Sequence, residues 1–385
     1  MAQEAASTLE NGTRTIALNP EILQRLNSLV ASAEALRQAG YVVQPLTDEE
    51  LEQKKRCLRC GVRISKKPRR VRKCPGRGQQ QRPQLAEAGQ QPRDDGSDSP
   101  ALGNGDPRNT DGVRSKLFLR CNFHPGNVIK KAWTCCGKHV TAAPCTGKED
   151  HDVQGLDDLV RLEMERRWQF HATAPETQPS HRVAVAIDCE MGTAFDGDSE
   201  LIRLTVIDYF TGEALIDSLV YPSIAMKHFN TRWSGITKGD MERSRRQGQC
   251  IIGRDAARRA LFRYVGPSTI VVGHSAQNDL SSLRWIHHRV VDSHMVESAI
   301  RKEAKLKAEQ EKKEEAVDKP KKGGPEDGQQ RGKQHPDGMS LKALAMKRLG
   351  RAIQMGKKGH DSLEDALAAR DLIHTHVIGL GSSDG

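Results

Sequence analysis

Hydrophobic and polar residues follow two different spacings between residues 183 and 380. Short apolar runs predict strands at 183–188, 200–208, 214–220 and 269–273. Apolar positions three and four residues apart predict helices at 256–265, 280–287, 341–349 and 363–376. Because strands come first and helices alternate with strands later, the pattern predicts an α/β domain in which helices flank a mixed sheet.

A helical pattern also occupies residues 20–52. Asn19 can cap the first helix, and a proline follows it at the first helical position. The pattern is interrupted by a glycine and a short strand-like run at 41–43. Thr47 and Glu50 then have the spacing of a capping box, which predicts another short helix.

The composition indicates that part of the chain cannot build a core. Hydrophobic residues make up 36% of the 385 positions and charged residues 29%. Residues 75–116 hold five Pro, seven Gly and six Gln and no aromatic residue, which predicts a disordered insertion. Residues 301–337 hold eleven basic and nine acidic residues, which predicts a solvated charged insertion that is helical at its start.

The net charge of +10 is concentrated in one segment. Residues 54–73 contain eleven basic residues and no acidic one, and such a cationic patch suits a polyanion such as nucleic acid. The run KKPRRVRK at 66–73 fits a nuclear-import signal equally well, and the two roles are compatible. No apolar stretch approaches the roughly 18 residues of a membrane span, and the N-terminus lacks the pattern of a secretory signal. We therefore expect neither membrane insertion nor export.

Acidic residues stand at the ends of several predicted elements. Asp188 and Glu190 lie two positions apart in IDCEMG, so they share one face of a strand. Asp279 opens a helix after the apolar part of VVGHSAQNDL, where it can simply complement the helix dipole. Asp365 lies in the first turn of the last predicted helix, five residues after His360 on the preceding loop. Each of these features alone has an ordinary structural explanation.

Together, the acidic residues and the loop histidine favour metal-dependent hydrolysis of a phosphodiester. Carboxylates held side by side repel one another unless a cation joins them. Mg²⁺ binds carboxylate oxygens and keeps positions open for phosphate and water. A histidine, which titrates near neutral pH, can take the proton of the attacking water. The set therefore predicts a two-metal-ion site.

The order Asp-x-Glu, Asp, His-x4-Asp resembles that of the DEDDh (DnaQ-like) group of 3′→5′ exonucleases. The sequence is most similar to the eukaryotic Rex-type RNA exonucleases, whose segments occur here in the same order: IDCEMG, TRWSGIT, GHSAQNDL, RVVDSHMV, SLKALAMKRLG, AIQ and GHDSLEDA. The match covers about 180–380, apart from the insertion at 301–337. It implies a ribonuclease-H-like fold and 3′→5′ exonuclease activity.

The resemblance also implies metal ligands. Asp188, Glu190 and Asp365 would hold the first of two Mg²⁺ (or Mn²⁺) ions. Asp188 would bridge to the second ion, and Asp279 would contribute through water.

The remaining matched positions would act on water and substrate. His360 would activate the hydrolytic water. Met191 and Gly192, which follow the acidic pair, would contact the terminal nucleoside through backbone groups. Recognition of a chain end in this way explains exonuclease rather than endonuclease action.

Seven of the nine cysteines lie between residues 57 and 145. In a reducing compartment, paired cysteines near histidines indicate structural zinc rather than disulfides. The candidate ligands are Cys57, Cys60, Cys121, His124, Cys136, Cys145 and His151. Cys74 and His139 are competing ligands, and the sequence does not decide between Cys135 and Cys136. The order CxRC, CxxHxG, CC, C and a late His is similar to the N-terminal region of Rex-type exonucleases.

The role of the cysteine-rich region stays open at this stage. The alternative to zinc is a set of unmetallated thiols. The region could extend a nucleic-acid track, with Phe123 and Trp133 either stacking on bases or packing a small core. It could equally bind a protein partner, of unknown identity.

The sequence predicts four regions, namely an N-terminal helical segment (1–53), a zinc-binding region (54–155), a linker (156–181) and an exonuclease domain (182–380). The expected function is a 3′→5′ exoribonuclease that acts on RNA 3′ ends and releases nucleoside 5′-monophosphates. A DNA exonuclease and an inactive zinc-containing RNA-binding scaffold are the alternatives. We expect it in the nucleus, with the nucleolus included and the cytoplasm as second choice.

Overall fold

A computed structural model describes residues 14–57, 59–63, 119–152, 158–175, 178–317, 338–356 and 359–380. Contacts divide the chain into two units, here called the α/β unit (Met1–Arg63 and Val153–Gly385) and the Cys/His unit (Ile64–Asp152). This division groups the N-terminal segment with the predicted exonuclease domain. The insertion at 75–116, the basic run at 66–73, Cys74 and residues 318–337 lie outside the described residues.

The α/β unit contains the main sheet and all the helices of the described residues. Its strands are β5 (His171–Ala172), β6 (Ala184–Ala194), β7 (Ser199–Asp208), β8 (Ala214–Tyr221), β9 (Met226–His228), β10 (Cys250–Ile252), β11 (Ile270–Gly273), β12 (Trp285–Ile286) and β13 (Val290–Asp292). Its helices are α1 (Pro20–Ser28), α2 (Ala33–Gln38), α3 (Asp48–Glu52), α4 (Asp158–Arg167), α5 (Thr231–Ser234), α6 (Lys238–Arg246), α7 (Arg254–Leu261), α8 (Gln277–Ser282), α9 (Ser293–Val317), α10 (Leu341–Leu344), the π-helix η1 (Ala345–Leu349) and α11 (Ser362–Gly379).

The main sheet has the strand order β10-β8-β7-β6-β11-β13, and β9 pairs with the far end of β6. Neighbouring strands among β6, β7 and β8 are antiparallel. Strand β11 runs parallel to β6, β13 runs parallel to β11, and β10 runs parallel to β8. Three antiparallel strands followed by parallel strands on the other side of the first are the arrangement of a ribonuclease-H-like fold. The predicted fold class is therefore confirmed.

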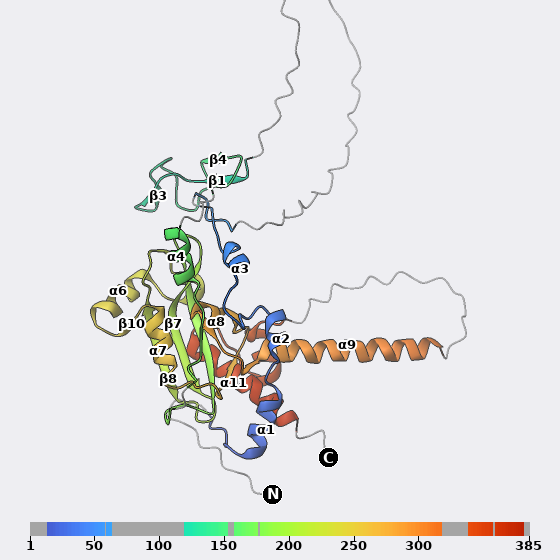
Figure 1. Cartoon of the computed structure of the whole chain (residues 1–385). Helices are drawn as coiled ribbons and strands as arrows, with labels where there is room; N and C mark the ends of the chain where they lie inside the picture. The colour runs from blue at the N-terminus through green and yellow to red at the C-terminus, as the bar shows by residue number, and fades with distance from the viewer. Residues whose placement is uncertain are drawn as a thin grey trace, which may run out of the picture. The chain divides into compact units, whose positions relative to one another are not determined.

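Helices cover both faces of this sheet, because successive strand residues point in opposite directions. On one face, Val185 and Ile187 join a core with residues of α2, α7 and α8. On the other face, Ala184 and Ala186 join a core with residues of α1 and α11. Figure 1 shows α7 and α8 beside the strands, and the long helix α9 extending away from them. Beyond residue 301, the described side chains of α9 are nearly all exposed, as predicted for the start of the charged insertion.

The N-terminal segment packs into both cores of the α/β unit. Leu26 of α1 and Leu36 of α2 have no exposed surface. The predicted caps are confirmed, since Asn19 accepts a hydrogen bond from the Ile22 N–H at 2.8 Å and a capping box opens α3. The predicted strand-like run at 41–43 is wrong, because these residues form no strand in the structure.

Two predicted helices differ from the structure. The helix expected at 280–287 ends at Ser282, because Arg284 adopts a positive φ of 52° and Trp285 begins strand β12. The helix expected at 341–349 divides into α10 and the π-helix η1. A π-helix inside a helical segment often marks a functional region.

The Cys/His unit consists of short strands and turns. Its strands are β1 (Cys121–Phe123), β2 (Val128–Ile129), β3 (Ala132–Trp133) and β4 (Thr146–Lys148). Strands β1 and β4 pair antiparallel, as do β2 and β3. Lys130 and Lys131 both have positive φ, as a tight two-residue hairpin turn requires. Within the described residues, no helix has the length and apolar character to span a membrane.

Candidate functional site

Asp188 and Glu190 lie in the middle of β6 and point to the same face of the sheet. Cys189 between them points into the core on the opposite face. The pairing of β6 with β7 shifts register directly after Glu190, so that Ile202 is an extra residue on β7. Such a bulge redirects the strand and is common beside active sites.

Asp279 is joined to the acidic strand by a backbone hydrogen bond. It lies in the first turn of α8 and is 5% exposed. The Cys189 N–H donates to Asp279 Oδ1 at 2.8 Å. Asp292 holds the loop before α8, because its carboxylate accepts from the N–H groups of Ser275 and Ala276 at 3.0 Å each. The hydrogen bond from the Cys189 N–H thus holds Asp279 beside the strand segment that carries Asp188 and Glu190.

Asp365 lies in the first turn of α11, as the sequence predicts, and is 4% exposed. The start of this helix is attached to β7. The hydroxyl groups of Ser362 and Thr205 lie 2.6 Å apart, and Arg203 forms an ion pair with Asp361 at 3.0 Å. These contacts place Asp365 over the face of the sheet that carries the first two carboxylates.

His360 lies on the loop that precedes α11. Its Nδ1 is 3.7 Å from Asp365 Oδ2, and its side chain is 39% exposed. Its backbone N–H donates to the Trp233 carbonyl at 2.6 Å, and the two rings meet edge to face with centroids 6.2 Å apart. Gly359 has a φ of +92°, and a Cβ there would overlap the backbone of Gly235. The loop therefore approaches α5 so closely that it needs glycine at 359.

The four carboxylates have raised pKa values. Burial, strengthened by the charges of Asp279, Asp365 and Glu190, raises the pKa of Asp188 well above its usual range. Burial followed by repulsion from Asp365 raises the pKa of Glu190 to about 8. Burial likewise raises the pKa of Asp279 to about 8 and is the main cause of the raised pKa of Asp365. Acidic groups that oppose one another's ionisation in this way form a site that favours added positive charge.

This donor set fits hard divalent cations. All four groups offer carboxylate oxygens, which Mg²⁺ and Mn²⁺ prefer. Within the described residues, the groups of three or more ligand atoms that lie within 4.8 Å of one another consist of cysteine and histidine. The charges of Asp279, Asp365 and Glu190 each raise the pKa of Asp188, so the four carboxylates lie close enough to act on one another.

Met191 and Gly192 follow the second carboxylate, where the sequence resemblance predicts nucleoside contacts. The Met191 carbonyl accepts from Asn230 Nδ2 at 3.0 Å. A Cβ at Gly192 would overlap the Met226 side chain, so this glycine also allows β9 to pack against β6. The predicted nucleoside contacts stay a prediction.

Two polar residues at the site were not identified from the sequence. Gln354 donates through its side-chain amide to both carboxylate oxygens of Asp365. Arg203 pairs with Glu190 across the strands, and its charge opposes the rise in the pKa of Asp188 and Glu190. Gln354 belongs to the AIQ segment, which is the one sequence signal for it. Nothing in the spacing around Arg203 distinguishes it from an ordinary strand residue.

The Cys/His unit brings together four possible metal ligands, namely His124, Cys135, Cys136 and Cys145. The sulfur atoms of Cys135 and Cys136 lie 3.6 and 3.5 Å from His124 Nδ1, and Cys135 lies 3.6 Å from Cys145. A tetrahedral zinc site with bonds of about 2.3 Å places sulfur ligands at similar separations. His124 Nε2 contacts the Ala142 carbonyl at 3.3 Å, as a metal-bound histidine commonly does with its other nitrogen. Cys135 and Cys136 therefore both belong to this ligand group, although the sequence alone does not decide between them.

The other predicted zinc ligands belong to separate units and stay predictions. Cys57 and Cys60 lie in the α/β unit, in a turn where the Gly61 N–H donates to the Cys57 carbonyl at 2.9 Å. Cys121 and His151 lie in the Cys/His unit, and Cys121 is completely buried. His139 contacts the Thr141 hydroxyl at 2.9 Å and is not part of the four-ligand group.

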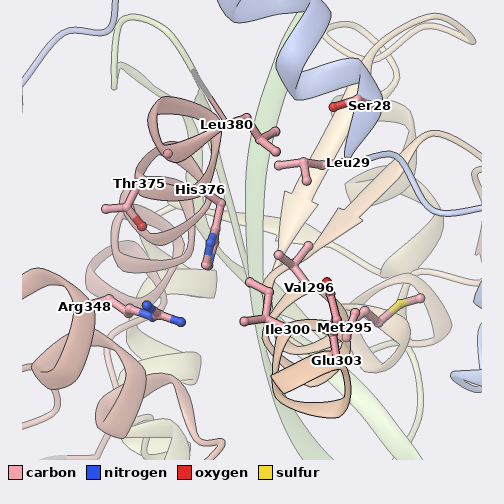
Figure 2. Close-up of a pocket in the computed structure, with 12 residues that line it drawn as sticks. Ser28, Leu29, Met295, Val296, Ile300, Glu303, Arg348, Thr375, His376 and Leu380 are labelled. Carbon is pink, nitrogen blue, oxygen red and sulfur yellow. The ribbon is translucent and has the colours of Figure 1, made fainter. Parts of the chain in front are cut away.

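A cavity of about 690 Å³ lies between α1, α9, η1 and α11. Figure 2 shows Val296 and Ile300 of α9 on one side of it and Thr375 and His376 of α11 on the other. Its lining includes none of the four carboxylates of the acidic site, and neither His360 nor Gln354. This cavity is therefore separate from the acidic site.

No family model matches the chain. Its sequence is similar to RNA exonuclease 3 of Candida albicans, with 29% identity over 260 residues that cover 67% of this chain and 54% of that protein. It is 30% identical to RNA exonuclease 3 of Emericella nidulans over 395 residues, which cover 90% of this chain and 50% of that protein. The apoptosis-enhancing nuclease of Homo sapiens is 30% identical over 197 residues, which cover 49% of this chain and 48% of that protein. The chain spans about half the length of these curated relatives.

Among solved structures, the chain is similar to the Pan2 catalytic unit of Neurospora crassa, a protease and nuclease domain. The match has a TM-score of 0.37 and 17% identity, and it covers 60% of this chain and 34% of that chain. The sequence relatives agree with the resemblance to DEDD-type exonucleases that the motif order indicates.

Proposed function

We propose that the α/β unit is a 3′→5′ exoribonuclease that uses two Mg²⁺ (or Mn²⁺) ions and releases nucleoside 5′-monophosphates. The observation that carries this proposal is the convergence of four buried carboxylates from β6, α8 and α11 beside His360 on a loop. Relatives named RNA exonuclease 3 support RNA as the substrate. The eleven basic residues at 54–73 also suit contact with the negatively charged RNA backbone.

Each side chain has a defined task in this proposal. Asp188, Glu190 and Asp365 would hold one cation, and Asp188 would share the second with Asp279 through water. Bound cations supply positive charge for the scissile phosphate and lower the pKa of the attacking water. His360 would take the proton from that water, and its exposed position on a loop gives it access to solvent.

The raised pKa values explain why the carboxylates suit this task. Without a cation, burial and repulsion favour protonation of Glu190 and Asp279. A cation reverses that preference, so its binding and the ionisation of the site are coupled. A purely structural cluster would gain nothing from keeping these like charges together, which argues against the inactive-scaffold alternative.

The direct test is shortening of 5′-labelled RNA in the presence and absence of Mg²⁺, with chromatographic identification of the released nucleotides. We expect a ladder that shortens from the 3′ end and nucleoside 5′-monophosphates as products. Asp188→Ala should abolish shortening, whereas Glu21→Gln on the surface of α1 should leave it unchanged. Equal shortening by Asp188→Ala would reject the assignment of the site.

Parallel assays on DNA and RNA oligomers of the same sequence distinguish an RNA exonuclease from a DNA exonuclease. A preference for RNA requires contacts to the 2′-hydroxyl, which the acidic site alone does not provide. Equal or faster degradation of DNA would favour the DNA exonuclease. Binding of RNA without any turnover in Mg²⁺ or Mn²⁺ would favour the inactive RNA-binding scaffold.

For the Cys/His unit, we propose one structural Zn²⁺ bound by His124, Cys135, Cys136 and Cys145. The sulfur and nitrogen separations and the second contact of His124 support this assignment. Among its described residues, the unit buries few apolar side chains, so it would gain folding free energy from the metal. Cys145→Ser should lower the zinc content measured by atomic absorption by one ion per chain, whereas Cys250→Ser in β10 should leave it unchanged.

We also propose a nuclear location, supported by the basic run at 66–73. Replacing its lysines and arginines by alanine in a fluorescent fusion should move the protein to the cytoplasm. An unchanged distribution would contradict this role and leave the run as a candidate RNA contact.

A further inference from the structure

Trp233 is the most exposed of the four tryptophans, all of which are described. It is 58% exposed, whereas Trp285 is completely buried and Trp168 is 8% exposed. Exposing a large aromatic ring gives up the free energy of its burial, so a rigidly held exposed ring suggests a binding function.

The backbone around Trp233 is held firmly. The Ser234 hydroxyl donates to the Phe229 carbonyl, and the Thr231 hydroxyl donates to the Ile236 carbonyl, both at 2.7 Å. Asn230, in the left-handed region with φ 53°, donates to the Met191 carbonyl beside the acidic pair. These contacts anchor the helical turn α5 to β6 and fix the backbone that carries Trp233.

Trp233 is also next to the reacting groups. Its carbonyl accepts the N–H of His360, and its ring centroid lies 6.2 Å from that of the histidine. In the proposed function, His360 acts on the water that attacks the scissile phosphate. A nucleobase attached near that phosphate therefore comes within reach of the indole ring.

The neighbouring charge suits the same ligand. The Arg232 guanidinium lies 5.0 Å from the centroid of the Trp233 ring, where it contacts one face. Trp233 as a whole residue keeps 58% of its surface exposed despite this contact. An aromatic face combined with an arginine is the usual means of binding single-stranded nucleic acid, because bases stack on the ring and the cation attracts phosphate.

We propose that Trp233 is a stacking platform for a base at the 3′ end of the RNA and that Arg232 contacts an adjacent phosphate. This inference rests on the proposed function, because it places the RNA end at the acidic site. The other explanation is purely structural: Trp233 would only support the His360 loop through its carbonyl. Every residue has a backbone carbonyl, so replacing the Trp233 side chain removes base stacking but keeps the carbonyl that accepts from His360. Such a substitution therefore distinguishes the two explanations.

The test is binding of a short RNA in Ca²⁺, with a check that the RNA stays intact. Stacking should quench tryptophan fluorescence in the unmodified protein, and Trp233→Phe should lose this quenching but keep most of the affinity. Trp233→Ala should weaken binding by about 5- to 150-fold, as expected for one lost base stack. Ile378→Ala, an exposed apolar residue at the opposite end of α11, is the matched control and should bind normally.

RNA with an abasic ribose at the last or the penultimate position provides the decisive comparison. Removing the stacked base should weaken binding to the unmodified protein and should have little further effect on Trp233→Ala. An unchanged affinity of Trp233→Ala, or an equal loss on intact and abasic RNA, would overturn the inference. If the unmodified protein shortens RNA but Trp233→Ala binds RNA normally, only the stacking role of Trp233 is rejected. If it shortens no RNA in Mg²⁺, the proposed function is rejected.

Discussion

The side-chain amide of Gln354 lies 2.9 Å from one carboxylate oxygen of Asp365 and 3.1 Å from the other. Gln354 adopts a left-handed φ of 55°, which is uncommon for a residue with a side chain. Its N–H donates to Glu364 at 2.8 Å, and its carbonyl accepts from Lys342 at 3.0 Å. The surrounding contacts thus hold an unusual backbone conformation that directs the amide at a predicted metal ligand.

Gln354 should therefore set the position of Asp365 for cation binding. Replacing Gln354 by Leu should lower the affinity for Mn²⁺ by about 10- to 100-fold, the usual cost of losing a group that orients a metal ligand. Titration followed by electron paramagnetic resonance, without RNA, measures this directly. Gln247→Leu at the exposed end of α6 is the control. Normal Mn²⁺ affinity in Gln354→Leu would show that the two hydrogen bonds do not position the ligand.

The raised pKa values predict a pH dependence of cation binding. Glu190 and Asp279 each have a pKa of about 8, so protons compete with cations below that value. Affinity for Mg²⁺ should increase between about pH 6 and pH 9, and binding should release protons. Calorimetry in buffers with different ionisation enthalpies measures both effects. Affinity that is constant over this range, without proton release, would contradict the proposed coupling.

The same shifts have the opposite effect on the stability of the cation-free protein. The folded protein retains protons on Glu190 up to about pH 8, whereas the unfolded chain loses them near pH 4.5. Between these values the folded state binds more protons, so its stability should fall as the pH rises. Thermal unfolding in a chelator should show this decline, and Glu190→Gln should reduce it. A decline of the same size in Glu190→Gln would show that it arises elsewhere.

The sequence was informative where local pattern and chemistry coincide. Apolar runs predict β6, β7, β8 and β11, because a buried strand is defined by its own residues. The three-residue strands β9, β10 and β13 of the same sheet are too short to be recognised from their own residues. The motif order alone predicts a shared site for Asp188, Glu190, Asp279, His360 and Asp365. In the structure the four carboxylates raise one another's pKa values, and His360 Nδ1 lies 3.7 Å from Asp365 Oδ2.

The errors and omissions have a different physical origin. The helix predicted over 280–287 ends early because residues 285–286 form strand β12, which pairs with the distant strand β5. The spacing of apolar residues within 280–287 gives no sign of this long-range pairing. Gln354 was missed because its role depends on a backbone turn that brings it to Asp365. The involvement of both Cys135 and Cys136 likewise depends on folding of the loop around His124. Tertiary contacts determined each of these outcomes.

Gly359 allows His360 to reach the acidic site. Its φ of +92° and its close approach to Gly235 leave no room for a Cβ. Gly359→Ala should displace the loop and lower the rate of RNA hydrolysis by about 10²-fold, because small misplacements of a catalytic group have large effects. Gly239→Ala in α6 is the control, since a Cβ there meets only Thr237 at an ordinary 3.6 Å. Full activity of Gly359→Ala, with an unchanged unfolding temperature, would show that the backbone conformation at residue 359 does not position His360 for catalysis.

Tyr41 joins the N-terminal segment to the loop that positions Asp279. Its hydroxyl donates to Asp292, whose carboxylate also accepts from backbone N–H groups before α8. Burial and the charge of Asp292 raise the pKa of Tyr41, so the hydroxyl stays protonated and can donate. Tyr41→Phe removes this donor from a buried carboxylate and should cost about 1–3 kcal/mol of stability in urea denaturation.

Tyr264→Phe is the matched control for this change. The Tyr264 ring contacts Arg263, and its hydroxyl forms no hydrogen bond with any of the described residues. Cation affinity should also fall in Tyr41→Phe if the loop before α8 loses its alignment, because Asp279 follows that loop directly. A stability equal to that of Tyr264→Phe would mean that the N-terminal segment does not support the acidic site through this contact. Such a result would favour a self-contained nuclease domain that begins near residue 182, as the sequence pattern alone suggests.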